Sequence, residues 1–371
     1  MKAPVFVSAA VLAVLLMAGG IGAQELRVPF VYVSGYRPEI SIFRLDLKAG
    51  TLTPVGKAAA GTDPSFLARD PAAKFLFAVN ETDPGRVRSF SIDQASGALT
   101  PINDQPAMGS TTAHLSTDRT GKWLFAANYG SRKAGTIASF PIAADGRLGA
   151  PVDTRDFGPG AMAHQIRTDP ANRFVFVPLK GGDGVAQLVF DAASGRLTPN
   201  TPPLAPSAKG AGPRHLDFHP NGRFVYVINE VDLTLTAHAF DAASGLLREL
   251  QVLPTVPTAA DRVGVSAADV HVHHSGRFLY GSNRGHNSIF IYRLGDDGQM
   301  TAIGHEMRDI RRPRHFTIDP TGTLLLVANQ DGASVTIFRI DQATGKLEPV
   351  GPPTPVGENP SFVGVVMLPG K

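Results

Sequence analysis

Three charged residues stand out because they depart from the residues at equivalent positions of a pattern that the chain repeats. Arg214 and Arg284 carry planar guanidinium groups, which suit carboxylates and oxyanions, and Glu230 carries the opposite charge. His164 stands at a comparable place, and an imidazole changes its charge near pH values of about 6.5. A charge that the chain buries needs a partner or a ligand. These residue types together indicate a site for an anionic ligand.

Seven further polar residues occupy comparable positions and are candidate substrate contacts. They are His215, Asn128, Asp269, His271, Arg314, His315 and Gln330. Each also has a structural interpretation, because buried imidazoles are usually satisfied by neighbouring groups and an Asn side chain can cap the end of a strand. His273 and His274 are close enough in sequence to His271 to suggest a metal site. They fall in a hairpin turn, however, so we expect surface imidazoles and no bound metal.

The candidate residues recur because the chain repeats a frame of two hairpins. The clearest copy runs from Gly210 to Glu230 and contains the turn His-Pro-Asn-Gly between two apolar segments. Proline fixes φ and glycine accepts positive φ in such a turn, so the flanking segments pair as antiparallel strands. The second strands of successive copies are anchored at Phe30, Phe75, Trp123, Phe174, Phe224, Phe278 and Leu324, which lie 45, 48, 51, 50, 54 and 46 residues apart.

A period of about fifty residues with four strands per copy is typical of β-propeller blades. No stretch shows the apolar period of a helix. We therefore predict an all-β fold, a seven-bladed β-propeller of four-stranded antiparallel blades. The residues from Asn359 onward are similar to the first-strand segment at Asp63, whereas the copy at Phe30 lacks a first strand. The C-terminal strand is thus expected to join the N-terminal blade and close the ring.

Composition excludes several classes of function. The chain has 371 residues, a net charge of +3, 39 Gly, 30 Pro and no Cys, so it is a turn-rich globular protein without thiolate chemistry or Cys-ligated zinc. The small, scattered basic excess gives no indication of a nucleic-acid partner. No serine-hydrolase elbow, phosphate-binding loop, dinucleotide glycine motif or zinc-protease motif occurs in the sequence.

The first 23 residues differ from the rest. Lys2 precedes an apolar run from Val5 to Met17 and a tail of small residues before Gln24, which is the pattern of a cleavable signal peptide. We therefore expect residues 1–23 to be a signal peptide and residues 24–371 a single propeller domain. The mature protein is expected to be periplasmic or secreted, to have no membrane contact after cleavage, and to be a monomer.

Several segments resemble one known family. GPRH at Gly212, NE at Asn229 and SNRGHNSI at Ser282 are similar to motifs of the seven-bladed propeller lactonase family, which includes bacterial 6-phosphogluconolactonases and fungal carboxymuconate cyclases. The resemblance runs from about Phe30 to Met367. It implies the propeller fold and a lactone as the small-molecule partner.

The resemblance also implies a set of active-site residues. His164, Arg214, Glu230 and Arg284 match the residues proposed for the cyclase branch. One segment departs from the family pattern, since PLKGGDG at Pro178 has Gly184 where a basic residue is expected.

The hypothesis that follows is hydrolysis of an anionic lactone at the axial cavity, without a cofactor. His164 would act as general base, Arg214 and Arg284 would hold an oxyanion or a carboxylate, and Glu230 would orient the imidazole or shuttle a proton. Two alternatives stay open. One is a propeller that binds an anionic sugar or peptide without catalysis, and the other is a cyclase-like enzyme that forms lactones.

Overall fold

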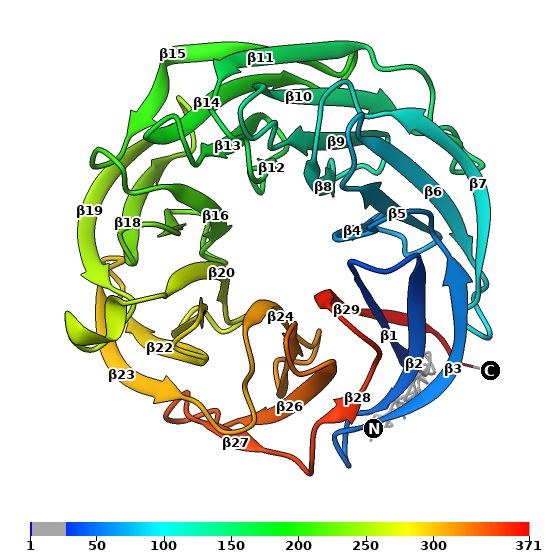
Figure 1. Cartoon of the computed structure of the whole chain (residues 1–371), viewed down its shortest axis with the longest axis vertical. Helices are drawn as coiled ribbons and strands as arrows, with labels where there is room; N and C mark the ends of the chain where they lie inside the picture. Colours follow the sequence, from blue (N-terminus) through cyan, green and yellow to red (C-terminus); the bar gives the residue numbers. More distant parts are fainter. Residues whose placement is uncertain (2–26, 371) are drawn as a thin grey trace.

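The chain forms a ring of seven antiparallel sheets around a central axis, each sheet containing at least four strands (Figure 1). A computed structural model describes Met1 and residues 27–370, so the expected signal peptide lies outside the described residues. The prediction of an all-β, seven-bladed propeller is confirmed. One 3-10 turn, η1 (Ala260–Arg262), is the helical element of the described chain, and no helix there is long and apolar enough to cross a bilayer.

Each blade contributes one strand to each of four concentric layers. The innermost strands are β4 (Leu67–Arg69), β8 (Thr112–Thr117), β12 (Arg167–Thr168), β16 (Pro213–Phe218), β20 (Ser266–Val272), β24 (Pro313–Ile318) and β29 (Pro360–Pro369). The second strands are β1 (Arg27–Gly35), β5 (Phe75–Asn80), β9 (Trp123–Asn128), β13 (Phe174–Leu179), β17 (Phe224–Asn229), β21 (Phe278–Arg284) and β25 (Leu324–Asn329).

The two outer layers complete the blades. The third strands are β2 (Glu39–Asp46), β6 (Arg86–Ile92), β10 (Ala134–Pro141), β14 (Gly184–Asp191), β18 (Thr234–Asp241), β22 (Ser288–Leu294) and β26 (Ser334–Ile340). The outermost strands are β3 (Thr51–Ala59), β7 (Leu99–Pro106), β11 (Asp153–Pro159), β15 (Arg196–Pro206), β19 (Leu246–Pro254), β23 (Met300–Glu306), β27 (Leu347–Pro349) and the short β28 (Thr354–Pro355).

The ring is closed by the two ends of the propeller. The C-terminal strand β29 pairs antiparallel with β1, with Val28 opposite Leu368 and Ser34 opposite Phe362. This pairing removes the edge that β1 would otherwise expose. The predicted closure is therefore confirmed.

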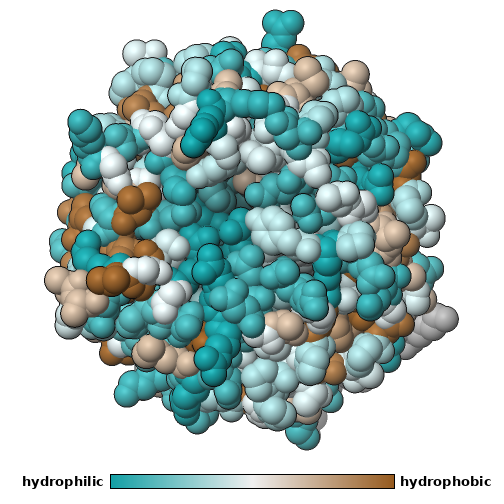
Figure 2. Space-filling view, in the orientation of Figure 1, coloured by the Kyte–Doolittle hydropathy of each residue, from teal (hydrophilic) through white to brown (hydrophobic). Residues whose placement is uncertain are grey.

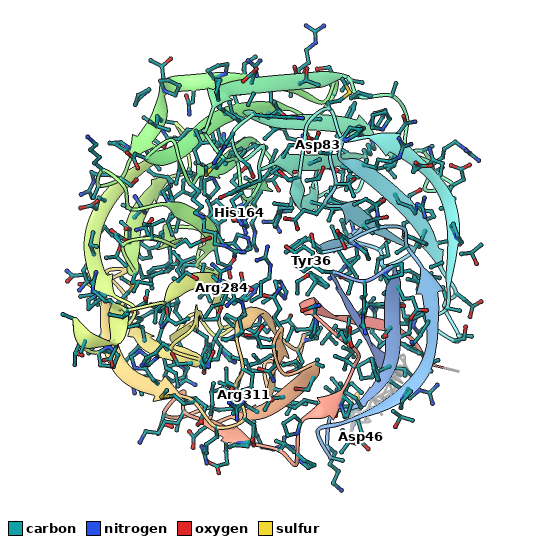
Figure 3. All side chains as sticks on the ribbon, in the orientation of Figure 1. Tyr36, Asp46, Asp83, His164, Arg284 and Arg311 are labelled. Atoms are coloured by element: carbon teal, nitrogen blue, oxygen red, sulfur yellow. The ribbon has the colours of Figure 1, made fainter. Side chains whose placement is uncertain are left out.

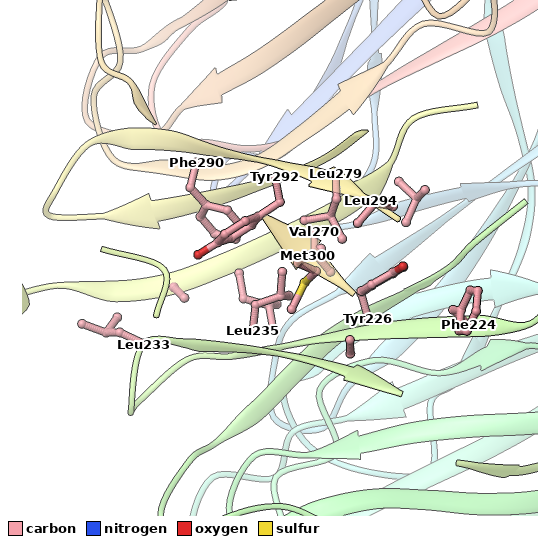
Figure 4. Packing of buried hydrophobic residues seen from close by; sticks show 14 of the residues in the cluster. Phe224, Tyr226, Leu233, Leu235, Val270, Leu279, Phe290, Tyr292, Leu294 and Met300 are labelled. Carbon is pink, nitrogen blue, oxygen red and sulfur yellow. The ribbon is translucent and has the colours of Figure 1, made fainter. Parts of the chain in front are cut away.

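The core lies between blades rather than within them. Second strands such as β9 and β17 are buried at every residue, because neighbouring sheets cover both of their faces. Phe224, Tyr226 and Leu235 of one blade pack against Leu279 and Phe290 of the next (Figure 4). Each fully buried side chain of this size contributes about 1.5–3 kcal/mol, so the interfaces between sheets supply most of the stability.

A contact between an aromatic ring and a glycine recurs at six of these interfaces. The anchor of each repeat lies against the glycine of the hairpin between the third and fourth strands of the next blade. The pairs are Phe30 with Gly97, Phe75 with Gly146, Trp123 with Gly195, Phe174 with Gly245, Phe224 with Gly298 and Phe278 with Gly345. The ring occupies the space where any other residue would place its Cβ. This contact explains why both the anchor and the glycine recur in the sequence.

The hairpin turns between the first and second strands of the blades are stabilised by hydrogen bonds to the side chain of the first turn residue. Asp169 and Asp319 accept several backbone N–H groups of their own turns, for example from Phe174 at 2.7 Å and from Thr323 at 2.8 Å. His273 takes this position in one blade. It was expected at the surface but is buried, and its Nε2 lies 2.8 Å from the carbonyl oxygen of Gly322 in the next blade. The expectation of a surface imidazole was wrong at His273, because it overlooked the turn of the neighbouring blade.

Replacing Gly298 with Ala should destabilise the protein more than replacing Gly222 with Ala. Both residues have positive φ, +81° and +69°, so the backbone penalty of roughly 1–2 kcal/mol is shared. A Cβ at Gly298 would also collide with the ring of Phe224, whereas a Cβ at Gly222 would meet nothing within 4 Å. Overpacking adds about 1–3 kcal/mol. Thermal unfolding of both variants measures the difference, and equal midpoints would contradict a steric role for this contact.

Candidate functional site

One end of the axial channel is surrounded by polar residues that follow the same rule in every repeat. Each stands six positions after the anchor of its second strand, and because all second strands point the same way, these residues meet at one end of the ring. This mouth ring consists of Tyr36, Glu81, Tyr129, Lys180, Glu230, Arg284 and Gln330. Tyr36, His164 and Arg284 lie around the centre of the ring in the view along its axis (Figure 3). In the same view the surface around the centre is hydrophilic (Figure 2).

Each blade contributes one residue to a second ring that lies closer to the axis. In six blades this residue stands five positions before the first residue of the inner hairpin turn, and in the seventh blade it is Ser361 of β29. This inner ring consists of Ser65, Ala113, His164, Arg214, Ala268, Arg314 and Ser361. All but Ala268 line a cavity of about 10 Å³, together with Phe66, His215 and His315. That volume is enough for about one water molecule. The imidazole of His164 and the guanidinium groups of Arg214 and Arg314 therefore converge on a space that admits about one water molecule.

Glu230 is the centre of an ion-pair network in the mouth. Its carboxylate lies 2.8 Å from Lys180 Nζ, 3.0 Å from Arg214 Nε and 3.2 Å from Arg284 Nη2. Burial alone would raise the pKa of Glu230, but Arg214, Arg284 and Lys180 outweigh burial and lower it to about 2. Glu230 is therefore ionised at neutral pH and holds three cations close together.

The mouth carries more positive than negative charge. Glu81 is the second carboxylate, and it accepts hydrogen bonds from Tyr36 Oη at 2.9 Å and from Ser65. Arg314 stacks over the ring of Tyr36 at 5.3 Å from its centroid. Four cations, Lys180, Arg214, Arg284 and Arg314, thus face two carboxylates. Several cations close together repel one another, so an anionic ligand between them is favoured.

His164 is placed by an irregular segment of its blade. The innermost strand here is reduced to β12, and Met162 has a φ of +55°, so His164 precedes the strand instead of lying in it. Its side chain is 6% exposed, its ring lies 5.6 Å from that of Tyr129, and its Nδ1 has no hydrogen-bond partner among the described residues. Burial and then Arg214 lower the pKa of His164 well below its usual value. The imidazole is neutral, with a free nitrogen.

A layer of side chains closes the axis below the inner ring. Its members, one residue further along each innermost strand, are Phe66, His114, Gln165, His215, Asp269, His315 and Phe362. Four of them accept a backbone N–H from the neighbouring blade. The pairs are His114 with Ile166 (3.5 Å), Gln165 with Leu216 (2.7 Å), Asp269 with Phe316 (3.3 Å) and His315 with Val363 (3.4 Å). The innermost strands are sheet edges, so this axial layer satisfies N–H groups that no further strand pairs.

Asp269 is the centre of the axial layer. Its Oδ1 lies 2.8 Å from His215 Nδ1, and its Oδ2 lies 3.0 Å from His271 Nε2 and 3.5 Å from His315 Nε2. These imidazoles hold the pKa of Asp269 well below its usual value against the effect of burial. The same carboxylate fixes His215 as the Nδ1–H tautomer, whose Nε2 faces Arg214 Nη1 at 3.4 Å. Asp269 therefore supports the mouth through His215.

Asp269, His271 and His315 are also the residues best placed to hold a metal ion, since one ligand atom from each lies within 4.8 Å of the others. The hydrogen bonds favour another arrangement. His315 Nδ1 accepts the N–H of Val363, so Nε2 carries the proton in the neutral ring and cannot also bind a metal. Hydrogen bonds to Asp269 account for this cluster without an ion.

The structure divides the candidate residues between two ends of the channel. Five candidates converge in the mouth, namely His164, Arg214, Glu230, Arg284 and Arg314. Asp269 and His271 instead line a separate cavity on the other side of the axial layer, and His215 and His315 border both cavities.

Two further candidates, Asn128 and Gln330, lie at or next to positions of the mouth ring. Asn128 is fully buried, and its side chain donates to Ala107 O at 2.7 Å and to Thr136 Oγ1 at 3.0 Å, so it is occupied within its blade. Gln330 belongs to the mouth ring, and its buried Oε1 has no partner among the described residues.

Sequence reasoning missed Lys180 and Tyr36. Lys180 lies 3.1 Å from Tyr129 Oη as well as 2.8 Å from Glu230, which makes it the fourth cation of the mouth. Both residues stand six positions after their anchors, as Glu230 and Arg284 do. That offset was the signal that could have found them.

The fold is thus a seven-bladed propeller, and its axial mouth holds a buried imidazole among clustered cations. The description "Lactonase, 7-bladed beta-propeller" matches residues 30–364. The chain belongs to this lactonase family, and the prediction of a lactone-hydrolysing enzyme is confirmed at that level.

Individual relatives agree with this assignment. The 6-phosphogluconolactonase of Pectobacterium carotovorum subsp. carotovorum (strain PC1) is 38% identical over 284 residues, which are 76% of this chain and 82% of the relative. That of Yersinia pestis is 33% identical over 330 residues, 88% and 94% of the two chains. The periplasmic gluconolactonase PpgL of Pseudomonas aeruginosa has a similar structure, with a TM-score of 0.84 and 28% identity over 92% of this chain and all of its own.

The buried imidazoles should make the protein sensitive to acid. Burial lowers the pKa of His215 and His238 from 6.5 to about 4 and that of His315 to about 3. Between about pH 4 and 6.5 the unfolded chain binds these protons and the folded chain does not. The free energy of unfolding should therefore fall as the pH drops from 6.5 toward 4, by about 1.4 kcal/mol per pH unit for each histidine. His271, whose pKa is raised, acts in the opposite sense above pH 6.5.

Urea unfolding of the wild-type protein and of His238→Gln between pH 4.5 and 7.5 measures this effect. His238 lies in β18, away from the axial layer, so its replacement should reduce the slope by one proton without disturbing the mouth. The exposed His274 provides the control substitution. Unfolding free energies that do not change over this pH range would contradict the prediction.

Proposed function

We propose that this protein hydrolyses an anionic sugar lactone, one that carries a phosphate or a carboxylate, in the axial mouth. The observation that carries the proposal is the convergence of neutral His164 with Arg214 and Arg314 on one water-sized cavity, inside a mouth with excess positive charge. The names of the relatives, 6-phosphogluconolactonase and gluconolactonase, support a sugar lactone as the substrate class.

The anionic group of the substrate would bind at the mouth ring. Lys180 and Arg284 are the cations of this ring, and Glu230 keeps both in place. A guanidinium can bind a carboxylate or phosphate through two parallel hydrogen bonds, which fixes the orientation of the ligand as well as its position. The lactone carbonyl would then point down the channel toward the inner ring.

Ring opening would use the groups around the small cavity. His164 would take a proton from a water molecule as the water oxygen bonds to the carbonyl carbon, and Arg214 and Arg314 would stabilise the oxyanion that forms. The tetrahedral intermediate collapses when the bond to the ring oxygen breaks. The protonated His164 would return its proton to the alkoxide that leaves. One imidazole thus acts as base and then as acid.

We assign Glu230 a positioning role rather than a proton-transfer role. A carboxylate whose pKa is about 2 is a poor proton donor at neutral pH, and three cations already occupy its oxygens. This choice refines the hypothesis from sequence, in which Glu230 either oriented the imidazole or shuttled a proton.

We also propose that the enzyme acts in the periplasm or outside the cell. The signal-peptide pattern of residues 1–23 supports export, and PpgL of Pseudomonas aeruginosa is named as periplasmic. An exported enzyme would meet lactones that form outside the cytoplasm.

Replacing His164 with Gln should lower kcat for lactone hydrolysis by about 10²–10⁴-fold, the usual contribution of a general base. The amide fills similar space but cannot take up a proton. Activity can be followed by titrating the acid that is released from 6-phosphogluconolactone and gluconolactone. His274→Gln serves as the matched control, since its imidazole is exposed at the opposite end of the channel. A His164→Gln enzyme with unchanged kcat would remove His164 from the mechanism.

Replacing Arg284 with Gln should raise KM for the phosphorylated lactone by about 10–100-fold, because a hydrogen bond to a charged group contributes about 1.5–3 kcal/mol. The neutral gluconolactone should be affected much less. Arg248→Gln, which removes an exposed guanidinium from outer strand β19, controls for the change in net charge. Equal changes in KM for both lactones would argue against an anion clamp at Arg284.

A further inference from the structure

A large cavity lies on the far side of the axial layer from the mouth. It has a volume of about 770 Å³, within the range of small-molecule sites, and shares only Phe66, His215 and His315 with the small cavity of the inner ring. Its charged and polar lining comes from the lower parts of the innermost strands and from their turns. Lactone hydrolysis as proposed above makes no use of this second cavity.

The carboxylates that line the second cavity are already saturated by internal donors. Asp118 accepts the backbone N–H groups of Thr120 and Trp123 and the side-chain amide of Asn172. Asp118 is also 1% exposed. Its oxygens therefore have little capacity left for a ligand.

The other two carboxylates of the cavity are occupied in the same way. Asp217 accepts from Arg167 at 2.7 Å and from the backbone of Val272 at 2.8 Å. Asp269 is surrounded by the three imidazoles described above and by two backbone N–H groups. The cavity thus offers few free acceptors to a ligand.

Two guanidinium groups of the cavity, those of Arg69 and Arg119, have more hydrogen-bond donors than protein acceptors. Arg69 donates only to two nearby backbone carbonyls, those of Asp70 and Pro71. Arg119 donates to the carbonyls of Asp169 (3.2 Å) and Thr168 (3.4 Å). A guanidinium has five N–H donors, so most donors of both groups have no protein acceptor.

Arg119 and Arg167 also lie within electrostatic reach of each other. They belong to neighbouring blades, and loss of hydration and then the charge of Arg167 lower the pKa of Arg119. His271 lies on the same wall between Asp269 and Asp217; burial lowers its pKa, but the two carboxylates outweigh burial and raise it. An anion placed between the two guanidinium groups would relieve their repulsion and use their free donors.

We propose that the second cavity is a binding site for a small organic anion, a carboxylate or phosphate ester of sugar size, held between Arg119 and Arg167 with Arg69 at its edge. The surplus of donors over free acceptors selects an acceptor-rich ligand. The volume admits a molecule with several hydroxyl groups beside the charged one. This site does not depend on catalysis in the mouth and would exist even if the mouth bound a different substrate.

The test is calorimetric titration of the full chain with inorganic phosphate and, separately, with D-gluconate. The Arg284→Gln background weakens anion binding in the mouth, so the remaining binding reports on the second cavity. Binding with a stoichiometry of one is expected in this background. Adding Arg119→Gln should raise the Kd at least tenfold, whereas adding Arg248→Gln should leave it unchanged.

Further variants keep the proposal falsifiable if Arg119→Gln fails to fold. Arg69→Gln changes an exposed residue and should raise the Kd about threefold, and Arg119→Lys should retain part of the affinity because it keeps the charge. Binding of only one probe would support the site and show which anionic group it selects. No binding of either probe in the Arg284→Gln background, or a Kd that Arg119→Gln does not change, would overturn the proposal.

Discussion

The structure depends on one constraint, which is that seven sheet edges meet at the axis with backbone N–H groups that no further strand can pair. Such groups are costly to leave unsatisfied away from water. The axial layer meets this need with side chains, since His114, Gln165, Asp269 and His315 each accept an N–H from the neighbouring blade. Polar residues at the axis are thus required by the fold before any function is considered. Several imidazoles that resemble catalytic residues in the sequence have this structural task.

The axial layer also separates two chemically different spaces. Above it, Glu230 gathers cations around the neutral imidazole of His164, so charge and proton acceptor lie side by side. Below it, the carboxylates are occupied, whereas Arg69 and Arg119 keep donors that have no protein acceptor. His215 connects the two spaces, because its Nδ1 faces Asp269 and its Nε2 faces Arg214. Structural hydrogen bonds and the proposed binding groups are therefore parts of one network.

The fold could be predicted from sequence because its determinants are local and repeated. Anchors such as Phe30 and Phe224 and the turn residues recur at nearly constant spacing, and the contact of each anchor with a glycine of the next blade explains that regularity. The site was predicted only in part. Lys180 shares the offset of Glu230 but not its residue type, so comparing residue types between repeats misses it, whereas counting six positions from the anchor finds it. Arg214 and His215 are adjacent, yet they belong to different tiers of the channel, and a difference of one residue decides which space a side chain faces.

The pairing of β29 with β1 has a consequence for the order of assembly. Six sheets are each built from consecutive residues and can form one after another as the chain grows. The seventh needs Arg27 and Pro369 together, at opposite ends of the propeller. Until that final segment arrives, the arc is open and β1 presents an unpaired edge to other chains. Biogenesis is consequently most vulnerable at its last step, and loss of β29 would reopen a finished ring.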